Sequence, residues 1–523
     1  MREYSADQKE TVFFTGRRLV VKSGAGSGKT TILKGYALQN PRERFLYLCY
    51  NSAIQREASA AFPGNVVCRT GHAIAMGIVG KPLEHKLSDN LRLTDIKNYI
   101  KAKDWGLTKD VSKGLSNFLN SSRSEISIAD LNFLPNFSSS QKKRNRLILS
   151  CIQKIWDAGL DASNPFPVTH DMYLKKFCMG PATMHKWFSG ILFDEVQDAN
   201  PVIADWVFKQ DKCKHILVGD DHQQLYRWRG AHNFMDEYAK KTGCKVNTMP
   251  QSYRFGNKTA DIATKLLDYK SKITKCARFP VYGNDKIKDE VYAFTPSLFR
   301  TSHRTVLHRT VIATLDTAIQ NIDKKIFWVG KISSYGLQGL LDVFYLKKDM
   351  KDKVRNKRLL TEHRSFASYQ NMAEETKDAE MLRTVKLLEK HGSSIPSKIA
   401  ALERNAVEDE SLADVTVSTA HRSKGLEWDH VELADDYPDL LDATKDWDDD
   451  IVGDEINLLY VSVTRSMKRL KVSDIVIEIF KKMGGDVSIF TSEIEEAGPP
   501  GNPLRDENVG VMKQRVKLNE KVG

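Results

Sequence analysis

The sequence predicts an α/β protein built on parallel β-sheets with helices on both faces. Short apolar runs alternate along the 523-residue chain with longer, charged stretches of helix-forming residues, a pattern typical of parallel sheets. A glycine-rich loop follows the first run, and two strand-poor regions interrupt the alternation. The runs that have the character of buried strands are residues 18–22, 45–50, 191–193, 215–218 and 415–418.

The two strand-poor regions predict insertions into the α/β framework. Residues from about 80 to 185 and from about 340 to 412 are charged and rich in helix formers, so each predicts a mostly helical insertion. The last stretch, residues 491–523, has turn residues and few apolar ones. This composition predicts a flexible C-terminal tail.

Composition indicates an intracellular protein with an anionic partner. The net charge is +12 at pH 7, and nucleic acid is the commonest partner of basic proteins. The seven cysteines are odd in number and form no C-x-x-C pair, which argues against disulfides and a zinc ribbon. The N-terminus is too polar for a signal peptide, and no apolar run approaches the roughly 20 residues that span a bilayer. We expect no membrane partner and a cytoplasmic location, or a nuclear one in a eukaryote.

The strongest local signal is the glycine-rich loop after the first predicted strand. Its glycines let backbone N–H groups surround phosphates, and a helix starting near Lys29 would direct its positive N-terminus at the anion. Lys29 can reach the β- and γ-phosphates, and the Thr30 hydroxyl can hold Mg²⁺. A chance glycine-rich turn is the alternative, but strand, loop and helix stand in the required order. The expected nucleotide-binding residues are Ser23, Gly24, Ala25, Gly26, Ser27, Gly28, Lys29, Thr30 and Thr31.

Two adjacent carboxylates, Asp194 and Glu195, follow another predicted strand. Because neighbours on a strand point to opposite faces, the two side chains can divide their roles. We expect Asp194 to hold Mg²⁺ through water, and Glu195 to orient or deprotonate the attacking water. A solvated acidic loop explains this pair equally well by itself. Together with the glycine-rich loop, the pair predicts an NTPase.

A further predicted strand precedes a stretch that joins polar, aromatic and basic residues. Gln223 lies just ahead of Tyr226, Trp228 and Arg229, whose side chains suit stacking on bases and binding of phosphates. A nucleotide sensor beside such a platform could couple hydrolysis to the grip on a nucleic acid. A position in the hydrophobic core is the alternative for Trp228.

The order of the motifs resembles that of UvrD/Rep-type superfamily 1 helicases. The stretches that carry this resemblance are residues 4–8, 23–31, 194–198, 219–231, 251–254, 419–427 and 459–465. Other stretches resemble the helicase part of the F-box DNA helicases, among them residues 44–51, 67–73, 169–174 and 332–337. The chain starts almost at the first motif, so we expect a protein without an F-box.

The resemblance implies roles around the nucleotide. Gln8 is implied to read the adenine, Tyr253 to stack on it, and Gln223 to sense the γ-phosphate. Arg254 and Arg465 are implied to meet the γ-phosphate, where a guanidinium stabilises the charge of the transition state. Without the motif context, a surface ion pair explains each arginine as well.

The resemblance also implies residues that link ATP to DNA. Gly425 and Glu427 are implied to touch the nucleotide, and Lys424 belongs to the same linking motif. The implied DNA contacts are Asn51, Thr70, His72, Tyr226, Trp228, Arg229, Thr419 and His421.

As a whole, the resemblance implies two RecA-like motor domains with ATP and Mg²⁺ in the cleft between them. The expected boundaries are 1–79 and 186–248 for the first motor domain, 80–185 for its insertion, 249–339 and 413–490 for the second motor domain, and 340–412 for its insertion. The implied activity is 3′→5′ movement on single-stranded DNA and unwinding at single-strand/double-strand junctions, in repair, recombination or replication. We expect a monomer or a weakly self-associating protein.

Three other functions fit parts of the same pattern. A translocase that strips proteins from DNA would carry the same motifs. A motor subunit of a helicase–nuclease complex, including one of antiviral defence, would find its nuclease in a partner. A non-catalytic binding module is the third alternative, which the intact catalytic candidates from Lys29 to Arg465 argue against.

Overall fold

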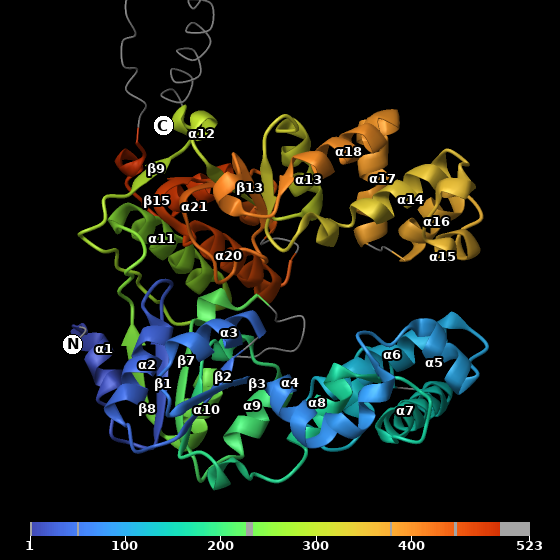
Figure 1. Cartoon of the computed structure of the whole chain (residues 1–523), viewed down its shortest axis with the longest axis horizontal. Coiled ribbons are helices and arrows are strands. Elements are labelled where there is room, and N and C mark those ends of the chain that lie inside the picture. Colours follow the sequence, from blue (N-terminus) through green and yellow to red (C-terminus); the bar gives the residue numbers. More distant parts are fainter. Residues whose placement is uncertain are drawn as a thin grey trace, which may run out of the picture.

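Two parallel β-sheets form the framework of the computed structural model, which describes residues 3–49, 52–136, 138–225, 234–376, 379–443 and 447–491. Each sheet lies in its own α/β unit, the N-terminal unit below and the C-terminal unit above in Figure 1. The α/β class with parallel sheets is confirmed. Each strand expected from the sequence lies within an observed strand, although Tyr50 falls outside the described residues.

The first sheet contains six strands among the described residues, and each pairing is parallel. Neighbouring residues face opposite cores, because Leu46 packs into one hydrophobic cluster and Tyr47 into another. Parallel strands bring their C-terminal ends to one edge, so the segments after β1 and β6 are neighbours. The strand order is β3 (Val66–Thr70), β2 (Phe45–Cys49), β6 (Gly190–Phe193), β7 (Lys214–Gly219), β1 (Arg18–Ser23) and β8 (Lys245–Met249).

Helices cover both faces of the first sheet. The helix that follows the glycine-rich loop buries Ile32 and Leu33 against the strand residues Leu19 and Val21. The helices of this unit are α1 (Ala6–Val12), α2 (Lys29–Gln39), α3 (Ser52–Ala61), α9 (Pro201–Phe208) and α10 (Phe234–Thr242).

A mostly helical segment separates β3 from β6 and extends to one side of the sheet (Figure 1). Its core is continuous with that of the sheet, since Val111 and Ile152 share one cluster with Leu46 and Leu217. The segment is therefore packed onto the first unit. It comprises α4 (Gly71–Ala75), α5 (Leu93–Ile100), α6 (Trp105–Leu119), α7 (Ser139–Leu160), α8 (His170–Cys178) and the short strands β4 (Leu87–Ser88) and β5 (Val168–Thr169).

The second sheet contains seven strands in the described part of the chain, and these too pair in parallel. The strand order is β12 (Ala406–Val407), β11 (Ile326–Trp328), β13 (Val415–Thr419), β10 (Arg304–His308), β14 (Trp428–Leu433), β15 (Ser466–Lys471) and β9 (Glu290–Tyr292). Its helices are α11 (Asn257–Thr274), α12 (Leu298–Thr301), α13 (Val311–Gln320), α19 (Leu440–Ala443), α20 (Asp449–Val463) and α21 (Asp474–Lys482).

A second helical segment lies between β11 and β12 and extends to the same side as the first (Figure 1). Leu340 and Leu387 of this segment share a cluster with Val415 and Val417 of the sheet. Its helices are α14 (Leu337–Lys347), α15 (Lys357–Glu362), α16 (Phe366–Thr376), α17 (Ala379–His391) and α18 (Ile395–Asn405). None of the helices in the described part of the chain has the length and apolar character of a membrane span. The expected tail, apart from Thr491, lies outside the described residues.

Candidate active site

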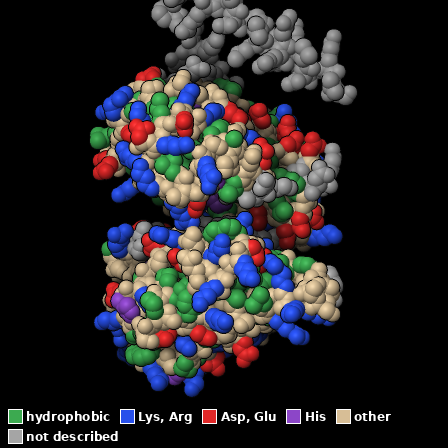
Figure 2. Space-filling view, turned by 90° about the vertical axis from the view of Figure 1, so that its right-hand side faces the viewer, with side chains coloured by type: hydrophobic (Ala, Val, Ile, Leu, Met, Phe, Trp, Pro, Cys, Tyr) green, Lys and Arg blue, Asp and Glu red, His purple; other side chains and the backbone are tan. Residues whose placement is uncertain are grey.

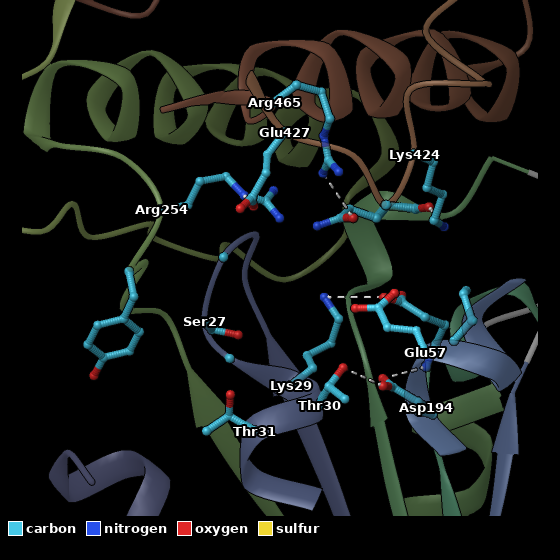
Figure 3. A pocket seen from close by; sticks show the side chains of 18 of the residues that line it. Ser27, Lys29, Thr30, Thr31, Glu57, Asp194, Arg254, Lys424, Glu427 and Arg465 are labelled. Atoms are coloured by element: carbon cyan, nitrogen blue, oxygen red, sulfur yellow. Dashed lines mark hydrogen bonds and ion pairs between the residues drawn. The ribbon is translucent and has the colours of Figure 1, made fainter. Parts of the chain in front are cut away.

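A large cavity lies between the two α/β units. It has a volume of about 1080 Å³ and is lined by residues from both units. Figure 2 shows the hollow between the two lobes, with lysine and arginine side chains on each of them. In Figure 3, Lys29, Thr30 and Asp194 rise from the first unit, and Arg254 and Arg465 face them from the second. The cavity therefore brings together candidates that lie more than 400 residues apart in the sequence.

The glycine-rich loop forms a tight turn between β1 and α2. Gly26 and Gly28 have φ values of 71° and 84°, a region that glycine adopts without steric cost. Helix α2 begins at Lys29, and its first N–H groups have no partner within the helix, so they can bind an anion. The loop thus offers phosphate-binding amides beside the Lys29 ammonium.

The start of this loop is fastened by the surrounding protein. The Ser23 hydroxyl donates to the carbonyl of Gly219 at 2.8 Å, which ties the end of β1 to the end of β7. The Gly24 amide donates to the carbonyl of Met249 at 2.9 Å. The amide of Ala25 donates to the hydroxyl of Tyr460, a residue of the second unit, at 3.0 Å. Of the later amides, that of Ser27 donates to the carbonyl of Gly24 at 3.4 Å, and those at the start of α2 remain available to a ligand.

Thr30 and Asp194 form the candidate metal site. The Thr30 hydroxyl donates to Oδ2 of Asp194 at 3.0 Å, and the hydroxyl of Tyr47 donates to the same oxygen at 2.8 Å. Burial, and after it the neighbouring Glu195, raises the pKa of Asp194. A buried carboxylate beside a hydroxyl suits Mg²⁺, which binds proteins through few oxygen ligands and completes its shell with phosphates and water. The two side chains therefore fit the expected ion.

Glu195 lies beside Lys29. We expected the side chains of Asp194 and Glu195 to point apart because neighbours on a strand alternate, but both residues lie beyond the end of the strand. Strand β6 ends at Phe193, and Glu195 has φ 52° and ψ 43°, a left-handed conformation. The carboxylates diverge because the backbone turns after the strand. Glu195 Oε1 lies 3.7 Å from the Lys29 ammonium, and its Oε2 accepts a hydrogen bond from Gln197 at 2.5 Å.

The charge state of Glu195 follows from the cations around it. Burial by itself would raise the pKa of Glu195, but Lys29 and then Lys424 outweigh burial and lower it. The carboxylate is therefore ionised at neutral pH and can accept a proton.

Gln223 lies at the contact between the two units. Its side-chain amide group donates to Oδ2 of Asp220 at 2.8 Å, and its side-chain oxygen accepts from the guanidinium of Arg465 of the second unit at 3.4 Å. The ammonium of Lys424 donates to the Gln223 carbonyl at 2.5 Å and also bonds to Asp198. The candidate sensor is thus held by two cations of the second unit.

The two predicted arginines lie in different environments. The guanidinium of Arg254 pairs with Glu427 at 2.6 Å and donates to the carbonyl of Thr464 at 3.0 Å. Arg465 is only 1% exposed and donates to the carbonyls of Val461 and Leu426. Burial, and then the nearby Arg254, lowers the pKa of Arg465. A guanidinium stays protonated at neutral pH nevertheless.

The remaining predicted nucleotide residues surround the same loop. Gln8 is buried, and its amide donates to the carbonyl of Ser27 at 3.2 Å. The half-exposed Tyr253 lines the cavity, as do Thr31 and Gly425. Gln8 therefore holds the backbone of the glycine-rich loop at Ser27, while the ring of Tyr253 is accessible from the cavity.

The predicted DNA contacts have a mixed placement. The Thr70 hydroxyl caps α4 by accepting from Ala73 at 3.1 Å, and His72 is half-exposed and lies 3.5 Å from Asp171. Thr419 is buried at the end of β13, whereas His421 lines the interdomain cavity. Asn51, Tyr226, Trp228 and Arg229 lie outside the described residues.

The structure adds residues to which the sequence pattern gave no role. Tyr47 bonds to Asp194, and Tyr460 bonds to the glycine-rich loop. Gln197 and Asp198 stand within a recognised motif, and their bonds to Glu195 and Lys424 appear only in three dimensions. For Gln197 and Asp198, the available signal was their proximity to the paired carboxylates. Tyr47 and Tyr460 stand within the stretches 44–51 and 459–465 that carry the resemblance, but their apolar neighbours gave no sign of a role for either hydroxyl.

Comparison with known proteins identifies the family. The family described as "UvrD-like helicase C-terminal domain" matches residues 86–476, well over half of the chain. The chain belongs to the UvrD-like helicase family. This membership confirms the resemblance read from the motifs.

Individual relatives agree with the family match. F-box DNA helicase 1 of Gallus gallus is 28% identical over 491 residues, which cover 88% of this chain and 47% of that protein. F-box DNA helicase protein 1 of Schizosaccharomyces pombe is 26% identical over 511 residues, covering 89% and 56%. DNA helicase II of Escherichia coli is 25% identical over 302 residues, covering 50% and 40%. The chain spans about half the length of the F-box relatives.

Proposed function

We propose that this member of the UvrD-like helicase family hydrolyses ATP between its two α/β units and moves 3′→5′ along single-stranded DNA. Unwinding of duplexes at single-strand/double-strand junctions, in repair, recombination or replication, is the use we assign to that movement. One observation carries the proposal: the glycine-rich loop with Lys29 and the two arginines of the other unit line one cavity. The helicase names of the relatives support it.

The residues of the first unit bind the phosphates and hold the attacking water. Lys29 and the amides at the start of α2 can bind the β- and γ-phosphates. The ionised Glu195 can take the proton of the attacking water on Oε1, because Gln197 holds Oε2. Thr30 and Asp194 would hold Mg²⁺, which neutralises charge on the phosphate oxygens when bound.

The residues of the second unit complete the site. Arg254 and Arg465 can stabilise the charge that spreads over the γ-phosphoryl oxygens. Arg254 is paired with Glu427, so a bound γ-phosphate would compete with an internal carboxylate for this guanidinium. If Arg254 leaves Glu427 to bind the γ-phosphate, closure of the two units depends on ATP. Alternate closing and opening would change the grip on DNA.

The test joins hydrolysis to movement. We expect single-stranded DNA to stimulate ATP hydrolysis, a 3′-tailed duplex to be unwound, and a 5′-tailed duplex to remain intact. Lys29→Ala should abolish both activities, because the phosphates lose their charged partner. Faster unwinding from the 5′ tail would contradict the direction, and hydrolysis by Lys29→Ala at the wild-type rate would contradict the site. Displacement of a DNA-bound protein without duplex unwinding would indicate a stripping translocase.

A further inference from the structure

Helix α20 of the second unit and the turn after it make three hydrogen bonds, among the described residues, to the sensor segment of the first unit, residues 220–224. Asn457 donates to the carbonyl of Gln224 at 3.0 Å. Tyr460 lies 3.3 Å from Asp220, and Arg465, just after the helix, lies 3.4 Å from the side-chain oxygen of Gln223. The C-terminal end of α20 thus fixes the position of residues 220–224 relative to the second unit.

The hydroxyl of Tyr460 has two partners in the first unit. It accepts the amide proton of Ala25 in the glycine-rich loop at 3.0 Å and donates its own proton to Oδ2 of Asp220. Oδ2 of Asp220 also accepts from the Gln223 side chain at 2.8 Å. Burial, and then Asp220, raises the pKa of Tyr460 well above its ordinary value. The phenol therefore keeps the proton that it donates.

The surroundings make this hydroxyl a constrained group. Tyr460 is fully buried, and its ring packs with Ala25 and Phe255 in a hydrophobic cluster that spans the two units. The ring is fixed by packing, so the position of the hydroxyl follows the position of α20. Any movement of α20 against the first unit therefore changes the hydrogen bonds of Tyr460 to Ala25 and Asp220.

We propose that Tyr460 is a positioning residue that ties the glycine-rich loop to the γ-phosphate sensor and orients Gln223 through Asp220. The inference rests on the proposed ATPase function and deepens it. The resulting chain runs from Ala25 through Tyr460, Asp220 and Gln223 to Arg465. It begins at the phosphate-binding loop and ends at the arginine of the second unit, so both sides of the cavity share one set of hydrogen bonds.

The decisive variant is Tyr460→Phe in the full chain, which keeps the ring and removes the hydroxyl. We expect kcat for ATP hydrolysis to fall about 10-fold, because Gln223 acts on the γ-phosphate during turnover. The KM for ATP and the melting temperature should change little. Tyr437→Phe is the matched control: its hydroxyl bonds to Ser462 of the same helix at 2.8 Å, entirely within the second unit. The control should keep the wild-type kcat.

A double variant separates positioning from a general structural effect. If Tyr460 acts through Gln223, adding Tyr460→Phe to Gln223→Ala should cost nothing further in kcat. A full additional 10-fold loss in that background would overturn the inference. So would a wild-type kcat in Tyr460→Phe alone, or an equal loss in Tyr437→Phe.

Amide exchange tests the same tether without turnover. Tyr460→Phe removes the acceptor of the Ala25 amide, so exchange in the loop peptide around residues 24–28 should become faster than in wild type and in Tyr437→Phe. Unchanged exchange would overturn the inference. A wild-type protein that does not hydrolyse ATP would instead overturn the proposed function, and the exchange measurement would still decide whether the tether exists.

Discussion

At the residue scale, the orientation of Asp194 depends on two hydroxyl groups. Thr30 and Tyr47 both donate to Oδ2, while Oδ1 accepts from the backbone amide of Glu195 at 2.9 Å. Burial, and then Asp194, raises the pKa of Tyr47, so its hydroxyl remains a donor. Thr30 and Asp194 are the residues proposed to hold Mg²⁺, and Tyr47 orients one of them from behind.

Tyr47→Phe should therefore weaken the response to Mg²⁺. Groups that orient a metal ligand typically contribute 10- to 100-fold to affinity, so we expect the Mg²⁺ concentration for half-maximal hydrolysis to rise by about 10-fold or more. The measurement is ATP turnover across a Mg²⁺ titration. Tyr36→Phe is the control, because the described residues give its buried hydroxyl no hydrogen-bond partner. Equal Mg²⁺ dependence in both variants would rule out the orienting role of Tyr47.

At the element scale, the glycine-rich loop is shaped by the second unit as well as by its own sequence. The carbonyl of Gly26 accepts from the amide of Tyr253 at 2.8 Å. A Cβ on Gly26 would lie 2.6 Å from Oγ of Ser252 and 2.7 Å from Cβ of Arg254. The glycine is needed for its backbone angle and for the close approach of the other unit.

Gly26→Ala should impair ATP binding without unfolding the chain. The positive φ costs a non-glycine residue about 1–3 kcal/mol. If bound ATP requires this loop geometry, affinity should fall roughly 5- to 150-fold. Nucleotide titration by calorimetry measures the loss. Gly64→Ala serves as the control, since its added Cβ would have no atom of the described residues within 4 Å. Wild-type ATP affinity in Gly26→Ala would show that the loop does not need this conformation.

The elements and the loop were predictable from sequence because their signals are local. A buried parallel strand needs a short apolar run, and the glycine-rich loop needs its glycines in fixed order. The partners of Tyr47 and Tyr460 were not predictable, because each hydroxyl meets residues more than 100 positions away. The turn at Glu195 was also missed, since nothing in the local sequence marks a left-handed residue there. Trp228 and the domain boundaries remain predictions.

At the scale of the whole molecule, the site exists only where the two units meet. A substitution at Arg465 is a poor test of whether the second unit takes part in hydrolysis, because its buried guanidinium also donates to the carbonyls of Val461 and Leu426. Removing it would lose these hydrogen bonds and leave a cavity where a fully buried side chain packs, so stability would fall as well as turnover. Arg254 is more suitable, because its main side-chain partner is Glu427, whose carboxylate is about half exposed.

Arg254→Gln should therefore separate catalysis from folding. Loss of an arginine that stabilises the transferred phosphoryl group costs on the order of 10³-fold in turnover, whereas a partly exposed ion pair contributes little to stability. We expect kcat for ATP to fall by about that factor, with a melting temperature close to that of wild type. Arg278→Gln is the matched control, because its pair with Asp268 lies within the second unit. ATP should still bind to Arg254→Gln, since Lys29 and the loop amides belong to the first unit. Turnover at the wild-type rate in Arg254→Gln would mean that hydrolysis does not use the second unit, and the proposed coupling of ATP to domain closure would fail with it.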